Sequence, residues 1–122
     1  MKEQQRKFEC YLDEQIAACK HRSELLAADD RMDEGNFEKV RANVYEIFKT
    51  ILSVAERICG GDDLAKRRFF IQKVEQIPAN WITSYEEAKQ HGDIERMHLE
   101  SIKLDTIREI KGMCMQIWEE TT

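Results

Sequence analysis

The stretch that decides the fold is residues 37–59, FEKVRANVYEIFKTILSVAERIC. Its apolar residues recur at steps of three and four: Phe37, Val40, Val44, Ile47, Phe48, Ile51, Ala55 and Ile58. This spacing predicts an amphipathic helix, because about 3.6 residues per turn place these side chains along one stripe. The polar residues mostly fall outside the stripe. Such a helix needs other helices to cover its apolar side.

Further helices are expected on both sides of this stretch. Residues 3–28 are expected to form a long helix. Its apolar side carries Phe8, Leu12, Ile16, Cys19 and Leu26. After residue 59 we expect helices at about residues 63–76, 78–90 and 93–119. Glycines at 60, 61 and 92 and the proline at 78 separate them, since glycine closes helices and proline fits best in a first turn.

The exact helix boundaries leave alternatives open. The central helix begins at a cap formed by Asp33, supported by a hydrophobic staple across it, or three residues later at Asn36. Either Asp62 or Asp63 caps the next helix. If Gly92 is tolerated inside a helix, at a cost of about 1 kcal/mol, the last two helices fuse into one rod.

These segments predict an all-α fold, an antiparallel helical bundle of four to five helices, three of them long and two short. The two short helices together can take the place of a fourth rod. A chain of 122 residues has the size of one domain and can bury a core without disulfides. We therefore expect a single helical-bundle domain over residues 1–122.

Charge and composition narrow the kinds of partner. Asp and Glu outnumber Lys and Arg by 24 to 19, which gives a net charge of −5 and disfavours nucleic acid and anionic membranes. The basic run Lys66, Arg67 and Arg68 does not change this, because two acids at positions 62 and 63 lie close before it. No signal peptide and no run of about eighteen apolar residues is present, so we expect a soluble cytoplasmic protein.

The four cysteines, at positions 10, 19, 59 and 114, form no Cys-x-x-Cys pair. Their scatter predicts free thiols and disfavours the usual zinc spacing. Cys10 lies on the side of its helix opposite to Phe8 and Leu12, so we expect it to be exposed. The other three lie on or beside apolar stripes and are expected to be small core residues.

One tetrapeptide has the spacing of a metal site. Glu95 and His98 form a Glu-x-x-His, which places a carboxylate and an imidazole on one helix face and is used by di-iron bundles. Those bundles need a second copy of the motif and two further glutamates, and this sequence has no second copy. We therefore predict no cofactor, although Glu95 and His98 remain the candidate metal ligands.

Arg96, Glu100 and Lys103 form the candidate ligand site. On a helical wheel Lys103 falls among apolar residues, and Glu100 is close enough to pair with it. A charged group partly inside a bundle can bind a small anion or, with His98, a metal. The alternative interpretation is that the lysine stem packs against the core while its ammonium reaches water.

The function that the sequence favours is a non-catalytic module that binds itself or another protein, with a homodimer as one expected form. Methionine beside aromatic residues is typical of adaptable surfaces, and apolar residues on secondary helix faces add to this. The candidate interface residues are Phe69, Ile82, Met113, Met115 and Trp118. No Ser/His/Asp or Cys/His arrangement is recognisable, so the sequence does not favour an enzyme.

Overall fold

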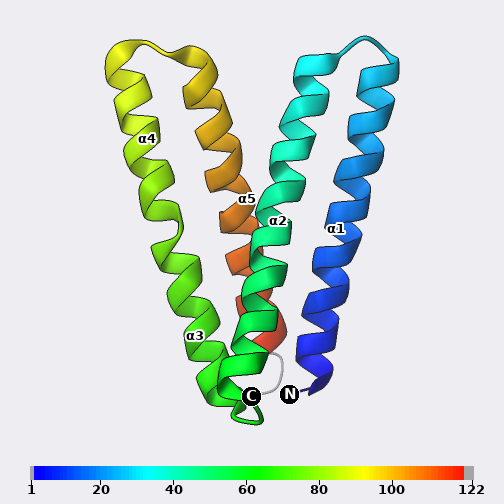
Figure 1. The fold of residues 1–122 in the computed structure, drawn as a ribbon, viewed down its shortest axis with the longest axis vertical. Coiled ribbons are helices and arrows are strands. Elements are labelled where there is room, and N and C mark those ends of the chain that lie inside the picture. Colours follow the sequence, from blue (N-terminus) through cyan, green and yellow to red (C-terminus); the bar gives the residue numbers. More distant parts are fainter. Residues whose placement is uncertain (1, 120–122) are drawn as a thin grey trace.

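The computed structural model describes residues 2–119, which form five α-helices. They are α1 (Lys2–Ala28), α2 (Met32–Cys59), α3 (Asp63–Gln76), α4 (Pro78–His91) and α5 (Ile94–Glu119). Figure 1 shows an α1–α2 hairpin beside a second hairpin, in which α3 and α4 together run antiparallel to α5. No strand occurs in residues 2–119. The predicted all-α antiparallel bundle is confirmed.

The helices α3 and α4 follow each other as one bent rod, so that four rods pack together (Figure 1). Ile77, between them, has helical angles of φ −60° and ψ −42°, and its N–H donates to the carbonyl of Lys73 at 3.0 Å. The predicted boundary before Pro78 is confirmed, and the chain bends there without leaving the rod. Pro78 occupies the first turn of α4, where its missing N–H and fixed φ are tolerated best.

The aromatic part of the core lies toward the end of the bundle where α1 begins and α5 ends (Figure 1). There the ring of Phe70 from α3 packs 5.2 Å from Phe8 of α1, 6.0 Å from Phe48 of α2 and 5.7 Å from Trp118 of α5, between centroids. Aromatic contacts of this kind add to the free energy of area burial. All four rods therefore meet around one aromatic cluster.

At the other end the two hairpins diverge (Figure 1). In the described part of the chain the backbone of α4 comes close to those of α3 and α5, and not to α1 or α2. None of the helices within residues 2–119 has both the length and the apolar character needed to span a lipid bilayer.

The turn between α1 and α2 is tighter than the sequence suggested. Asp30 adopts a left-handed conformation with φ 61°, and the N–H groups of Asp30 and Arg31 donate back to carbonyls of the last turn of α1 at 3.1 and 2.8 Å. This is a Schellman closure, in which aspartate replaces the usual glycine. Because this closure ends at Arg31, the next helix can begin at once.

The predicted cap of α2 at Asp33 or Asn36 is wrong, because α2 already begins at Met32. The start is held by tertiary contacts between the hairpin helices. The Ser23 hydroxyl donates to the buried carbonyl of Gly35 at 3.0 Å, and a Cβ at Gly35 would lie 3.2 Å from the Ser23 carbonyl oxygen. Glycine at this position therefore allows the two backbones to approach closely.

The other predicted boundaries are confirmed. Gly60 ends α2 with φ 57°, and the Asp62 side chain caps α3 by accepting a backbone N–H at 3.1 Å. Gly92 has φ 69°, and the Asp93 side chain accepts a backbone N–H of the first turn of α5 at 3.2 Å. The fused rod is thereby excluded, since a left-handed residue ends a helix.

The predicted apolar stripe of α2 is only partly buried. Val44, Phe48 and Ala55 are buried, but Ile47 and Ile58 are 38% and 64% exposed. Buried residues outside the predicted stripe are Ala42, Tyr45 and Leu52. The helix packs against α1, α3 and α5, so its covered side is a broad sector rather than one line.

Candidate functional site

A groove of about 490 Å³ lies between α3 and α5. It is lined by Leu64, Arg67, Arg68, Ile71, Gln72, Glu75 and Met115. Leu64 is 55% and Met115 42% exposed, so two large apolar side chains line this groove in contact with water. Exposed apolar side chains that gather at one groove are characteristic of interaction sites.

Leu64 is an apolar residue of α3 that does not lie on the covered side of this helix. The buried side of α3 consists of Lys66, Phe70 and Val74, and Leu64 lies about 120° around the helix from Phe70. Lys66, the first residue of the basic run, is only 8% exposed and pairs with Glu56 of α2 at 3.1 Å. The lysine stem thus occupies the covered position instead of Leu64.

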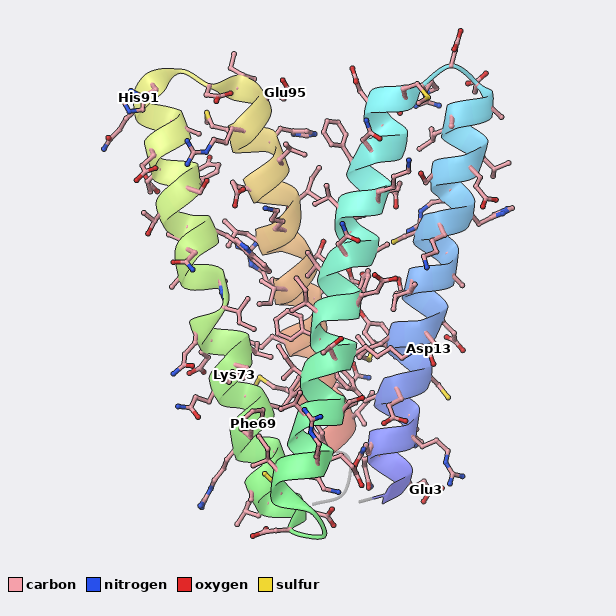
Figure 2. All side chains as sticks on the ribbon, viewed as in Figure 1. Glu3, Asp13, Phe69, Lys73, His91 and Glu95 are labelled. Carbon is pink, nitrogen blue, oxygen red and sulfur yellow. The ribbon has the colours of Figure 1, made fainter. Side chains whose placement is uncertain are left out.

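A second groove lies along the other side of α3 and shares Leu64, Arg68 and Gln72 with the first. Phe69 lines this second groove, and the ammonium of Lys73 lies 5.5 Å from its ring centroid. Figure 2 shows both side chains next to each other on α3. We define the α3 surface as the continuous outer side of this helix with Met115, that is, Leu64, Arg67, Arg68, Phe69, Ile71 and Met115.

The α3 surface carries free positive charge. Neither Arg67 nor Arg68 forms an ion pair with any described residue, whereas Glu75 at the rim is paired with Lys111 at 3.7 Å. The whole chain has a net charge of −5, so the α3 surface is more positive than the chain as a whole. It favours acidic groups on whatever binds there.

The candidate interface residues are divided among different places. Phe69 and Met115 belong to the α3 surface. Ile82, 50% exposed, lies in a groove of about 380 Å³ between the α3–α4 rod and α5. Met113 lines a groove between α1 and α5. Trp118 is 5% exposed and packs on Phe8 and Phe70, so it belongs to the core.

The candidate ligand site is brought together only in part. The ammonium of Lys103 donates to Oε1 of Glu100 at 3.0 Å and lies 5.9 Å from the ring centroid of Trp81. Arg96 instead reaches across to α4, where it donates to Ser84 Oγ at 2.9 Å and Glu87 Oε2 at 3.1 Å. The charge of Lys103 is therefore already balanced, and the pair offers no spare positive charge to an anion.

Glu100 is 7% exposed, and its second oxygen, Oε2, is buried without a hydrogen-bond partner among the described residues. Buried carboxylate oxygens usually accept hydrogen bonds, and leaving one unpaired is costly.

The candidate metal ligands lie apart from any other suitable group. Glu95 and His98 are both exposed, and Figure 2 shows Glu95 near the α4–α5 turn. The imidazole of His98 packs edge-on against Phe37 of α2, with centroids 4.5 Å apart. Within residues 2–119 no three His, Cys, Asp or Glu side chains gather in a way that could hold a metal ion.

A polar cluster that no local sequence pattern indicates joins three helices. The hydroxyls of Tyr11 in α1 and Tyr45 in α2 donate to the two carboxylate oxygens of Glu109 in α5, at 3.2 and 3.0 Å. Burial, with the nearby negative charge, raises the pKa of both tyrosines. Both hydroxyls stay protonated at neutral pH, so the cluster serves as a structural link between the three helices.

We expect the Tyr45–Glu109 link to make stability depend on alkaline pH. The pKa of Tyr45 is raised above its ordinary value of 10.0 by folding, so the folded state keeps a proton that the unfolded chain loses. Stability from this group is complete below pH 10 and falls as pH rises further. Urea unfolding from about pH 8 to about pH 11 should show a flatter decline for Tyr45→Phe than for the wild type.

The control for this experiment is Tyr85→Phe, because the Tyr85 hydroxyl has no hydrogen-bond partner among the described residues. At neutral pH Tyr45→Phe should lose about 1 kcal/mol, the typical value of one hydrogen bond, and Tyr85→Phe much less. If the free energy of unfolding of Tyr45→Phe falls with rising pH as steeply as that of the wild type, the proposed role of the Tyr45–Glu109 hydrogen bond is contradicted.

All four cysteines are free, as predicted, and Cys10 is exposed. Cys19 and Cys114 are buried, while Cys59 is partly exposed. Burial raises the pKa of Cys114 to about 12, which keeps its thiol protonated and unreactive. The buried cysteines therefore act as small core residues.

Comparison of the chain with protein families, with curated proteins and with solved structures finds no match. The class of the protein therefore follows from its own geometry. It is a small all-helical protein of four packed rods, with an exposed apolar groove along one of them and two arginines there that have no ion pair within residues 2–119.

Proposed function

We propose that this protein is a non-catalytic interaction module that binds an acidic, amphipathic helix of another protein molecule through the α3 surface. The observation that supports the proposal is the combination, in one groove, of exposed Leu64 and Met115 with the unpaired Arg67 and Arg68. An apolar groove accepts the apolar face of a helix, and a basic rim selects acids beside that face.

The composition of the groove suits this role. Met115 has an unbranched, polarizable side chain that adapts to differently shaped partners. Arginine presents a planar group that binds carboxylates in a bidentate way. The Arg side chains can therefore orient a helix, while Leu64, Ile71 and Met115 cover its apolar face.

The test is binding of a fluorescent synthetic helix with leucines at positions i, i+4 and i+7 and glutamates on the remaining sides, followed by anisotropy. We expect the wild type to bind it and Met115→Glu to bind at least about tenfold more weakly, which corresponds to about 1.4 kcal/mol. Ile82→Glu is the matched control, because Ile82 is similarly exposed but lies outside the α3 surface. It should bind as the wild type does.

The same helix with lysines in place of the glutamates should not bind, since it would meet Arg67 and Arg68 with like charge. Equal binding of the two peptides, or undiminished binding by Met115→Glu, would refute the α3 surface as the site. Absence of binding by the wild type would refute the proposed function.

A further inference from the structure

We infer that the α3 surface binds the α1–α2 turn of a second copy of this chain, so that molecules associate head to tail. This inference rests on the proposed function and names a second copy as the partner, with the two helix ends at the α1–α2 turn in place of a single long helix. The element that would enter the groove is the acidic tip, which we define as Leu25, Asp29, Asp30, Met32 and Asp33.

The acidic tip is chemically complementary to the α3 surface. Leu25 is 58% and Met32 54% exposed, and they lie on the two helices that meet at the turn. The carboxylates of Asp29, Asp30 and Asp33 are exposed and form no ion pair with any described residue. In the inferred contact, the acidic tip of one molecule supplies two exposed apolar side chains and acids without ion pairs. The α3 surface of the other molecule supplies two exposed apolar side chains and two arginines without ion pairs.

Electrostatics favours this contact over other contacts between copies. Each chain has a net charge of −5, so most orientations of two molecules bring like charges together. Arg67 and Arg68 are unpaired cations beside exposed apolar groups, and the tip carries unpaired acids beside exposed apolar groups. Orientations that bring the arginines of one molecule to the acids of another combine charge attraction with the burial of apolar surface.

The two complementary elements lie at opposite ends of the molecule. Figure 1 shows the α1–α2 turn at the end where the hairpins diverge, and the start of α3 at the end where α1 begins and α5 ends. One molecule therefore cannot fill its own groove. A pair joined in this way leaves one tip and one groove free, so the contact is heterologous and further copies can add.

The test is sedimentation velocity of the full chain from about 5 µM to about 500 µM, in about 50 mM and about 500 mM salt. In low salt the average mass should rise with concentration to more than twice the monomer mass, because the contact does not close at a dimer. In high salt the rise should shrink, since these charges are exposed to solvent.

Two charge reversals identify the surfaces. The groove variant is Arg67→Glu with Arg68→Glu, and the tip variant is Asp29→Lys with Asp33→Lys. Each alone should remain monomeric over the whole concentration range, because its tip and groove then carry the same sign. An equimolar mixture should assemble again, since each variant offers the other an opposite charge.

Restoration in the mixture also shows that both variants are folded. The matched control is Lys89→Glu with Glu86→Lys on α4, two exposed residues without ion pairs in the described part of the chain, and it should assemble like the wild type. A wild type that stays monomeric, a tip variant that still associates, or a mixture that does not assemble would each overturn the inference.

The outcomes separate this inference from the proposed function. If the acidic peptide binds the α3 surface while the chain remains monomeric, the head-to-tail contact is refuted and the interaction module stands. If neither the peptide nor a second copy binds, both are refuted.

Discussion

Phe70→Ala should lower the free energy of unfolding by about 4 kcal/mol, the range typical of a fully buried phenylalanine. Phe70 is 0% exposed, and its ring contacts aromatic residues from α1, α2 and α5. Removing it leaves a cavity where all four rods meet. Since small domains have only about 5–15 kcal/mol of stability, the variant should be close to unfolding at room temperature.

The neighbouring Phe69 provides the control. Its ring is partly exposed on the outer side of α3 and contacts Lys73, so Phe69→Ala should cost about 1 kcal/mol. Urea unfolding of both variants, followed by circular dichroism, measures the difference. Similar losses at the two positions would show that the aromatic cluster is not the centre of the core.

Lys103→Met should destabilise the protein by about 2 kcal/mol, whereas Glu100→Met should be neutral or stabilising. The first change retains an apolar stem but leaves the 7% exposed Glu100 as a buried charge without a partner. The second removes that buried charge together with its unpaired oxygen. Lys103, whose side chain is 30% exposed, can then direct its ammonium to water.

The measurement is urea unfolding of both single variants and of the double variant at neutral pH. The double variant should resemble Glu100→Met, because without the carboxylate Lys103 has no buried charge to balance. If Glu100→Met instead lowers the free energy of unfolding as much as Lys103→Met does, the ion pair contributes net stability and the unpaired oxygen does not destabilise the fold.

The helices could be predicted from the sequence because their signals are local. The glycines at 60 and 92 and the caps Asp62 and Asp93 act within one turn, and each ends or starts a helix as expected. The start of α2 could not be predicted, because the contact between Ser23 and Gly35 depends on how two helices approach. The boundary at Pro78 was predicted, but the continuation of α3 and α4 as one bent rod depends on packing against α5.

The sequence indicated which residues the candidate sites contain, but not how all of their side chains are arranged. The pairing of Glu100 with Lys103 follows from their spacing on one helix. The partner of Arg96 lies on α4, and no pattern within α5 reveals it. Trp118 was expected on a surface, but the rings of α1 and α3 cover it.

By itself, the sequence determined that the chain forms helices, where most of them end and that they must pack together, because periodicity, glycine conformation and capping act over a few residues. Only the tertiary structure decided which sides are covered and which charges are paired. Tyr45 and Glu109 are 64 positions apart, and Leu64 is exposed because Lys66 takes the covered side of α3. Such outcomes depend on which helix faces which, and no local pattern contains that information.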